Sequence, residues 1–258
     1  MNTKLGLLLL LALAATSWVG TPAARAEDGP EISVSWLTGG IYLVEDSDFV
    51  ATNSLVYIGK SYVTVVGATW TPDTAKELAT RVRSLTNLPI REVIDTSPDP
   101  EWSGGNAYWR EAGAEVVAAQ VTCDALSHTW DSTVVDFRRS QPGYPPLPLA
   151  APTKCTSDHF ELQNGEVRAF YLGPSHTSAD IFVYFPKEQV LDAGSILKPF
   201  LGNMAKANVE EYPRTLQKLK GLRLNVKMII AGHWTAVHGP DLVDRYLDLL
   251  AQSKSQAK

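Results

Sequence analysis

The order of β-branched and helical segments along the chain restricts its fold more than any other feature. Short β-branched runs come first and helical segments follow them, and this order occurs twice with no Gly/Ser linker between the halves. No residue-level repeat accompanies it. Two β-sheets packed together with helices outside satisfy the pattern as one domain. We therefore predict an α/β fold in which residues 27–258 form a single domain.

Turn and capping signals divide these segments. Thr71 and Pro72 predict a helix start, because threonine is a favoured N-cap and proline a favoured first helical residue. A proline-rich connection, residues 141–152, follows a longer helix. Strands are expected at residues 32–37, 41–44, 55–58, 63–66, 93–94, 116–118, 160–162, 167–171, 181–184, 190–191 and 227–231, and helices at 71–85, after Gly104-Gly105, at 124–139, at 209–220 and from Pro240.

The first 26 residues have the pattern of an export signal. Lys4 precedes an apolar run at residues 5–15, and Ala24-Arg25-Ala26 is a small-Xaa-small cleavage site. A retained membrane anchor is the less favoured alternative, because the run is shorter than the ~20 residues of a spanning helix. We expect residues 1–26 to be a signal peptide cleaved near Ala26, and the mature protein to be periplasmic or secreted, with no membrane contact.

Charge and cysteine content exclude several classes of protein. Loss of the two positive charges of Lys4 and Arg25 takes the formal net charge from −5 to −7, and no block of basic residues remains, which argues against a nucleic-acid partner. Two cysteines exclude a disulfide scaffold or a Cys-rich zinc module. After export, Cys123 and Cys155 could form a disulfide, but two free buried thiols are equally consistent with the sequence. Five histidines leave room for one modest metal site.

Three turns that follow apolar strands contain the candidate chemistry. They are residues 95–106, 173–177 and 231–239, and functional groups tend to collect on such loops. Each turn is weak evidence alone, because an acidic turn before a helix is usually a solvated cap. A single loop histidine is more often a hydrogen-bonded structural residue than a ligand, and we expect that role for His238.

A family pattern spans almost all of the expected mature chain. Its segments are residues 63–75, 104–109, 113–118, 165–171, 173–177, 181–186, 195–198, 201–203, 232–233 and 238–240. Together they resemble the class B metallo-β-lactamases, and the segments from residue 165 to 186 resemble the mono-zinc, carbapenem-hydrolysing subclass B2. The resemblance implies an αβ/βα sandwich of two mixed sheets with helices on the outer faces, and a metal at the rim between the sheets.

The metal-ligand positions of this family have changed residue type here. The first motif of the subclass reads Asn-Xaa-His-Xaa-Asp, and this chain has Ser97, Asp99 and Glu101 at the three specified positions. Where the subclass has its metal-binding cysteine, this chain has Ser195. The resemblance implies one Zn²⁺ at Glu101, Ser195 and His233. Serine binds zinc poorly, because its hydroxyl stays neutral where a cysteine would be a thiolate.

Two further positions complete the implied metal site. Asp99 and His176 join Glu101 and His233 in a set of two carboxylates and two imidazoles. Such a set would suit Zn²⁺, Mn²⁺ or Fe²⁺. The resemblance also places Asp99 near the attacking water, where its carboxylate could act as a base.

Two positions match the substrate side of the family. Lys198 matches the lysine that pairs with the β-lactam carboxylate, and Asn203 matches the asparagine near the lactam carbonyl. Lys198 could instead be an exposed loop charge, and Asn203 could simply form a turn. The functional interpretation is favoured, because a charge-assisted bond to lysine suits a carboxylate-bearing small molecule.

Three hypotheses for function follow. The first is hydrolysis of the amide bond of β-lactams, carbapenems included, by a metal-activated water. The second is a non-catalytic exported protein that keeps the fold and has lost tight zinc binding. The third, a serine hydrolase using Ser195 and His233, is disfavoured because the sequence around Ser195 is not Gly-Xaa-Ser-Xaa-Gly. The protein is expected to be a monomer.

Overall fold

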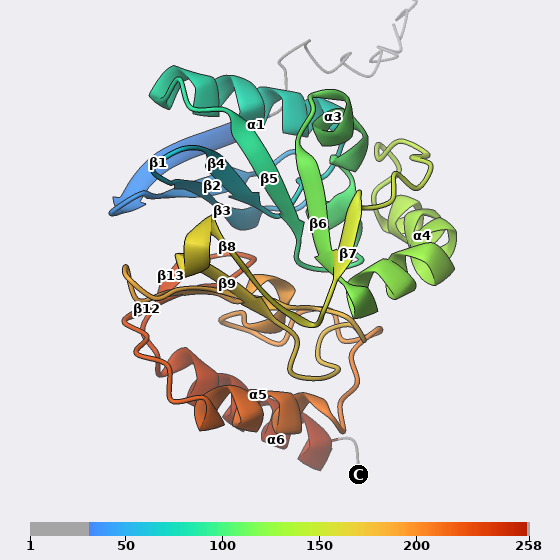
Figure 1. Cartoon of the computed structure of the whole chain (residues 1–258). Helices are drawn as coiled ribbons and strands as arrows, with labels where there is room; N and C mark the ends of the chain where they lie inside the picture. Colours follow the sequence, from blue (N-terminus) through green and yellow to red (C-terminus); the bar gives the residue numbers. More distant parts are fainter. Residues whose placement is uncertain (1–30, 257–258) are drawn as a thin grey trace, which may run out of the picture.

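The computed structural model describes residues 31–256, and these residues form two β-sheets that face each other, with helices on the outer sides (Figure 1). The predicted αβ/βα sandwich is therefore confirmed. The predicted signal peptide, residues 1–26, lies outside the described residues.

The first sheet has seven strands in chain order, antiparallel from its first to its fourth strand and parallel from its fourth to its seventh. The strands are β1 (Ile32–Thr38), β2 (Ile41–Asp46), β3 (Thr52–Ile58), β4 (Val63–Val66), β5 (Ile90–Asp95), β6 (Glu115–Ala119) and β7 (Lys154–Thr156). Strand β7 was not predicted from the sequence. It has only three residues, and its pairing with β6 crosses a long connection, so no local pattern marks it.

The second sheet has six strands in the order β13-β12-β11-β10-β9-β8, and only the β11–β12 pair is parallel. The strands are β8 (His159–Leu162), β9 (Val167–Phe170), β10 (Phe182–Phe185), β11 (Val190–Asp192), β12 (Met228–Ile230) and β13 (Val237–His238). Both sheets are mixed, as expected.

Helices α1 (Pro72–Leu85) and α3 (Asn106–Glu111) cover the outer face of the first sheet, and α5 (Tyr212–Gly221) and α6 (Leu242–Gln256) that of the second (Figure 1). Helices α2 (Pro100–Ser103) and α4 (Gln120–Ser140) contribute residues to the rim cavity described below, and η1 (Gln163–Gly165) and η2 (Gly194–Ile196) are short 3₁₀ turns. Within the described part of the chain, no helix has the length and apolar character needed to cross a membrane.

Helix α1 begins and ends where the sequence predicts. The Thr71 side chain accepts a hydrogen bond from the Thr74 backbone, and the Thr74 side chain caps Thr71 in return. Helix α5 begins at Tyr212, three residues later than predicted, because Pro213 belongs in a first helical turn and the preceding residues are held in a turn by Asn208. Helix α4 begins at Gln120, four residues earlier than predicted, because β6 runs directly into it without a loop.

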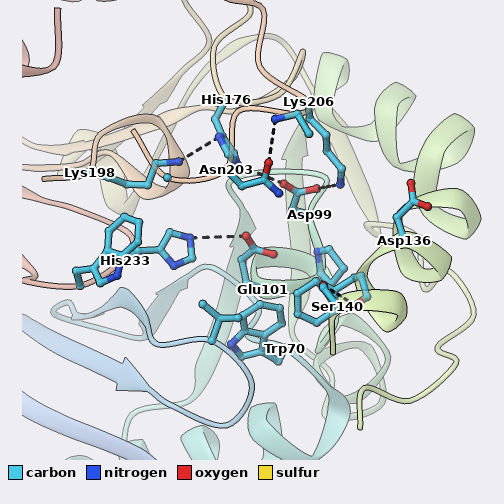
Figure 2. A pocket seen from close by; sticks show the side chains of 16 residues that line it. Trp70, Asp99, Glu101, Asp136, Ser140, His176, Lys198, Asn203, Lys206 and His233 are labelled. Atoms are coloured by element: carbon cyan, nitrogen blue, oxygen red, sulfur yellow. Dashed lines mark hydrogen bonds and ion pairs between the residues drawn. The ribbon is translucent and has the colours of Figure 1, made fainter. Parts of the chain in front are cut away.

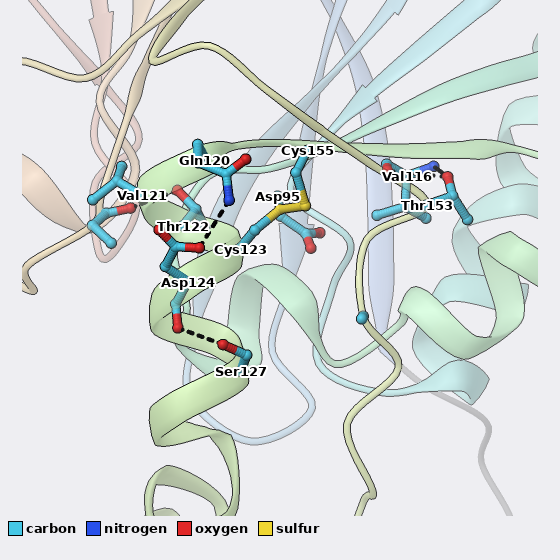
Figure 3. Close-up of a disulfide and its surroundings, with 12 residues drawn as sticks. Asp95, Val116, Gln120, Val121, Thr122, Cys123, Asp124, Ser127, Thr153 and Cys155 are labelled. Carbon is cyan, nitrogen blue, oxygen red and sulfur yellow. Dashed lines mark hydrogen bonds between the residues drawn. A yellow bond between two sulfur atoms is a disulfide. The ribbon is translucent and has the colours of Figure 1, made fainter.

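A disulfide joins Cys123 of α4 to Cys155 of β7, which decides between the two possibilities that the sequence left open (Figure 3). The Cα atoms lie 6.1 Å apart, within the ordinary range for a disulfide. The bond fastens the start of the long helix to the edge strand of the first sheet.

The central core lies between the sheets. Its buried side chains come from the inner faces of both: Ile41, Leu43, Leu55, Tyr57, Val66, Ile94, Ala119, Leu162, Val167, Ala169, Ile181, Val183, Phe185, Val190, Ile230 and Ala236. Burial of this apolar surface fixes the two sheets relative to each other. The loops at the sheet ends are thereby held on a rigid frame.

Candidate functional site

The three predicted turns meet at one rim of the sandwich, around a cavity of about 600 Å³ (Figure 2). Each turn contributes to its wall. The lining residues are Val50, Trp70, Asp99, Pro100, Glu101, Asp136, Phe137, Ser140, His176, Lys198, Gly202, Asn203, Ala205, Lys206, His233 and Trp234. Of the predicted site residues, all but Ser195 line this cavity.

Asp99 is bound by a lysine that sequence reasoning missed. The side chain of Asp99 is buried, and the Nζ atom of Lys206 donates to its Oδ1 atom at 2.6 Å (Figure 2). Lys206 also donates to Thr133 Oγ1, on α4, at 3.4 Å. No motif marks Lys206 in the sequence, because its pairing spans 107 positions. Lys206 thus occupies one oxygen of the carboxylate for which the resemblance implies a role as a base, and that role stays a prediction.

His176 lies between Lys198 and Asp99. Lys198 Nζ donates to His176 Nδ1 at 3.1 Å, and His176 Nε2 is 3.9 Å from Asp99 Oδ2. Because Nδ1 accepts, the ring proton of the neutral imidazole is on Nε2, facing the carboxylate. Burial lowers the pKa of His176 below its ordinary value, with Lys198 adding to the effect.

The two predicted substrate positions differ in their environment. Lys198 is only 2% exposed, so the alternative of an exposed loop charge is wrong. Burial lowers the pKa of Lys198 to about 8. Asn203 is exposed, and its Oδ1 atom accepts a hydrogen bond from the Ala205 backbone at 2.9 Å. Asn203 therefore forms a turn, and it also lines the cavity.

Glu101 and His233 form a second pair in the same cavity. His233 Nε2 is 3.8 Å from Glu101 Oε1, and His233 Nδ1 donates to the Ala51 carbonyl at 3.0 Å. Burial lowers the pKa of His233 to about 4. Burial, reinforced by the charge of Asp99, raises the pKa of Glu101 to about 8. At neutral pH the pair is thus a neutral imidazole beside a mostly protonated carboxyl group.

Ser195 is turned away from the cavity. It lies in η2, is 2% exposed, and its Oγ atom accepts a hydrogen bond from Trp102 Nε1 at 2.7 Å. The Trp102 ring in turn contacts the His233 ring edge-on. The hydroxyl of Ser195 is therefore part of the packing beneath the site.

Asp180 is a second residue that sequence reasoning missed. Its buried carboxylate accepts hydrogen bonds from Ser97 Oγ at 2.7 Å, Ser175 Oγ at 3.0 Å and Thr177 Oγ1 at 2.8 Å, and from the Thr177 backbone. It joins the turn of Asp99 to the turn of His176. The one sequence signal that could have pointed to Asp180 is its position as an acidic residue just before the apolar strand β10.

The side-chain atoms that could coordinate a zinc ion are not gathered around one point in this cavity. Tetrahedral zinc needs four ligand atoms at about 2.0–2.3 Å. Across residues 31–256, no cluster of three or more His, Cys, Asp or Glu side chains could hold a metal ion. The expected ligands Asp99, Glu101, His176 and His233 instead form two separate carboxylate–imidazole pairs, and Ser195 is bound to Trp102. The described geometry does not bring the predicted five-residue metal set together around one point, and that set stays a prediction from the sequence.

Comparison with known proteins gives a consistent result. A family model described as "Metallo-beta-lactamase superfamily" matches residues 47–233. The chain is similar to "Metallo-beta-lactamase IND-1" of Chryseobacterium indologenes, with 26% identity over 78% of each chain. It is similar to "Metallo-beta-lactamase type 2" of Elizabethkingia meningoseptica, with 24% identity over 95% of this chain and 97% of the relative.

Among solved structures, FIM-1 from Pseudomonas aeruginosa in its mono-zinc form superposes with a TM-score of 0.74. The identity is 16%, over 86% of this chain and 96% of the other. At that identity the likeness concerns the fold alone.

Proposed function

Because the chain belongs to the metallo-β-lactamase superfamily, we propose that its cavity binds a β-lactam or a similar amide that carries a carboxylate. Curated relatives over most of the chain are named as metallo-β-lactamases, which supports this class of ligand. The finer assignment to subclass B2 stays a prediction from the sequence, since the relatives do not single out that subclass.

The observation that carries the proposal is the placement of two ammonium groups in one cavity. Lys198 and Lys206 both line it, together with the aromatic rings of Trp70, Phe137 and Trp234. A lysine ammonium has three donors, and one of those of Lys198 is taken by His176. The others are available for a carboxylate, while the aromatic wall suits the apolar part of a small molecule.

The binding experiment uses mature, chelator-treated protein and isothermal titration with a carbapenem and a penicillin. We expect saturable binding that weakens at least ~10-fold, about 1.4 kcal/mol, in Lys198→Met. Lys227→Met is the matched control, because Lys227 is exposed and lies outside the cavity. Absence of saturable binding, or equal affinity in Lys198→Met and the native protein, would refute the proposal.

Hydrolysis of the bound amide is the second candidate function, favoured by the Glu101–His233 pair. The protonated carboxyl of Glu101 is a general acid and the free Nε2 of His233 is a general base, and both line the cavity. Water oxygen would bond to the amide carbonyl carbon as its proton passes to His233. The carbon–nitrogen bond would then break as the amide nitrogen takes the proton of Glu101.

Loss of β-lactam absorbance under the same metal-free conditions tests the second candidate. If the pair performs hydrolysis, Glu101→Gln should lower turnover by about 10²-fold or more while binding persists. Binding without turnover in the native protein would reject hydrolysis. It would leave the alternative that the sequence raised, a non-catalytic ligand-binding member of the family.

Export is proposed on the sequence pattern alone. We expect the mature protein to begin near Glu27 and to be recovered from the periplasm or the medium. An oxidising compartment would also allow the Cys123–Cys155 bond to form and persist. Amino-terminal sequencing of the fractionated protein tests this, and an intact Met1 in the membrane fraction would contradict it.

A further inference from the structure

Two buried carboxyl groups face the cavity, and the burial of charge requires compensation. Asp99 is 6% exposed and Glu101 8% exposed. A buried carboxylate is costly unless it is paired with a cation or neutralised. Glu101 lies 3.8 Å from the imidazole of His233, and Asp99 needs a cation of its own. Lys206, 2.6 Å from its Oδ1 atom, supplies it.

The loop around Lys206 is built to hold its ammonium in this place. Asn203 Oδ1 accepts from the Ala205 backbone, and the Ala207 backbone donates to Met204, so residues 203–207 form a closed turn. The next residue, Asn208, donates its backbone N–H to Ser175, beside His176. Hydrogen bonds thus fasten the loop to the wall of the cavity.

Two of the neighbouring atoms that could bind a metal are already hydrogen-bonded to protein groups. His176 Nδ1 accepts from Lys198, whose ammonium adds a second positive charge to the same wall. The hydroxyl of Ser195 accepts from Trp102. A divalent ion bound to the Oδ1 atom of Asp99 would have to displace Lys206. It would also meet the positive charge of Lys198, which lies on the other side of the His176 ring from Asp99, and like charges repel.

We propose that Lys206 is the resident cation of this cavity, and that its ammonium takes the place that a metal ion would occupy beside Asp99. The protein then folds and presents its cavity without a divalent metal. Zinc competes with Lys206 for Asp99 and binds weakly.

The test measures zinc binding by equilibrium dialysis with elemental analysis, in the absence of any β-lactam. Native protein should take up clearly less than one equivalent, and EDTA should leave its melting temperature unchanged. Lys206→Met frees Asp99, so zinc affinity should rise at least about 10-fold, in the range by which groups beside metal ligands alter affinity. Lys206→Arg keeps the cation and should behave like the native protein, as should the exposed control Lys227→Met.

One tightly bound zinc in the native protein, with a melting temperature that EDTA lowers, would overturn the proposal. So would a folded Lys206→Met variant whose zinc affinity equals that of the native protein. If Lys206→Met does not fold, the double variant Asp99→Asn/Lys206→Met should regain native-like stability, because it removes both charges of the pair. Failure of the double variant to recover would also count against the proposal. None of these outcomes depends on whether the cavity binds a β-lactam.

Discussion

Replacement of Asp180 by alanine should destabilise the protein more than any other single change at the rim. The buried carboxylate accepts four hydrogen bonds, from Ser97, from Ser175 and two from Thr177. A hydrogen bond to a charged group contributes about 1.5–3 kcal/mol. The four are not additive, because water can enter the space that alanine leaves. We therefore expect the free energy of unfolding to fall by about 3–5 kcal/mol, the usual range for breaking a buried charged network.

The loss should be visible in both chemical and thermal unfolding. For a domain of this size, about 2–4 °C of melting temperature accompanies each kcal/mol, so a fall of about 6–20 °C is expected. Urea titration followed by circular dichroism gives the free energy directly. Asp180→Asn keeps the shape of the side chain, but its amide NH₂ group would face groups that are themselves hydrogen-bond donors. We expect the free energy of unfolding to fall somewhat less in this variant, by about 2–3 kcal/mol.

Asp241→Ala is the control. Asp241 forms an ion pair with Arg245 at 3.1 Å, but its side chain is 68% exposed, so its loss should change the free energy of unfolding by about 0.5 kcal/mol or less. If Asp180→Ala costs less than about 1 kcal/mol, the argument that this carboxylate holds the two turns together is wrong.

Three more outcomes are expected. Replacing Cys123 and Cys155 by serine removes a disulfide that spans 32 residues, and should lower the free energy of unfolding in urea by about 3–4 kcal/mol. The native protein in the presence of reductant should have the same stability as this variant. Burial raises the pKa of Glu101 from 4.5 to about 8, so the stability that this carboxyl group contributes is complete below about pH 4.5 and is lost as the pH rises through about 8. Melting temperatures measured across this pH range should therefore decline in the native protein, and Glu101→Gln should remove that decline. Gly232→Ala would bring a Cβ atom to 2.5 Å from the Gly194 backbone and should cost about 1–3 kcal/mol in urea unfolding, whereas an unchanged midpoint would show that the backbone yields freely.

Elements with strong local patterns were predictable because their signals lie within a few residues. Helix α1 shows this, since its capping threonine and first-turn proline place its start. Strand β13 was missed, because two residues carry no periodicity and its pairing with β12 depends on the intervening turn. The Cys123–Cys155 bond was open for a similar reason: the sequence contains no distance between α4 and β7.

In the candidate site, too, some features were predictable from the sequence and others only from the fold. The amino-acid sequence placed Asp99, His176 and His233 in turns that follow strands, and the family resemblance implied that these turns meet at one rim of the sandwich, which the structure shows. It could not determine the partner of each side chain. Lys206 reaches Asp99 across 107 positions, and Trp102 reaches Ser195 across 93. Such contacts depend on how the packed sheets place their loops, so the cation beside Asp99 became visible only in the folded chain.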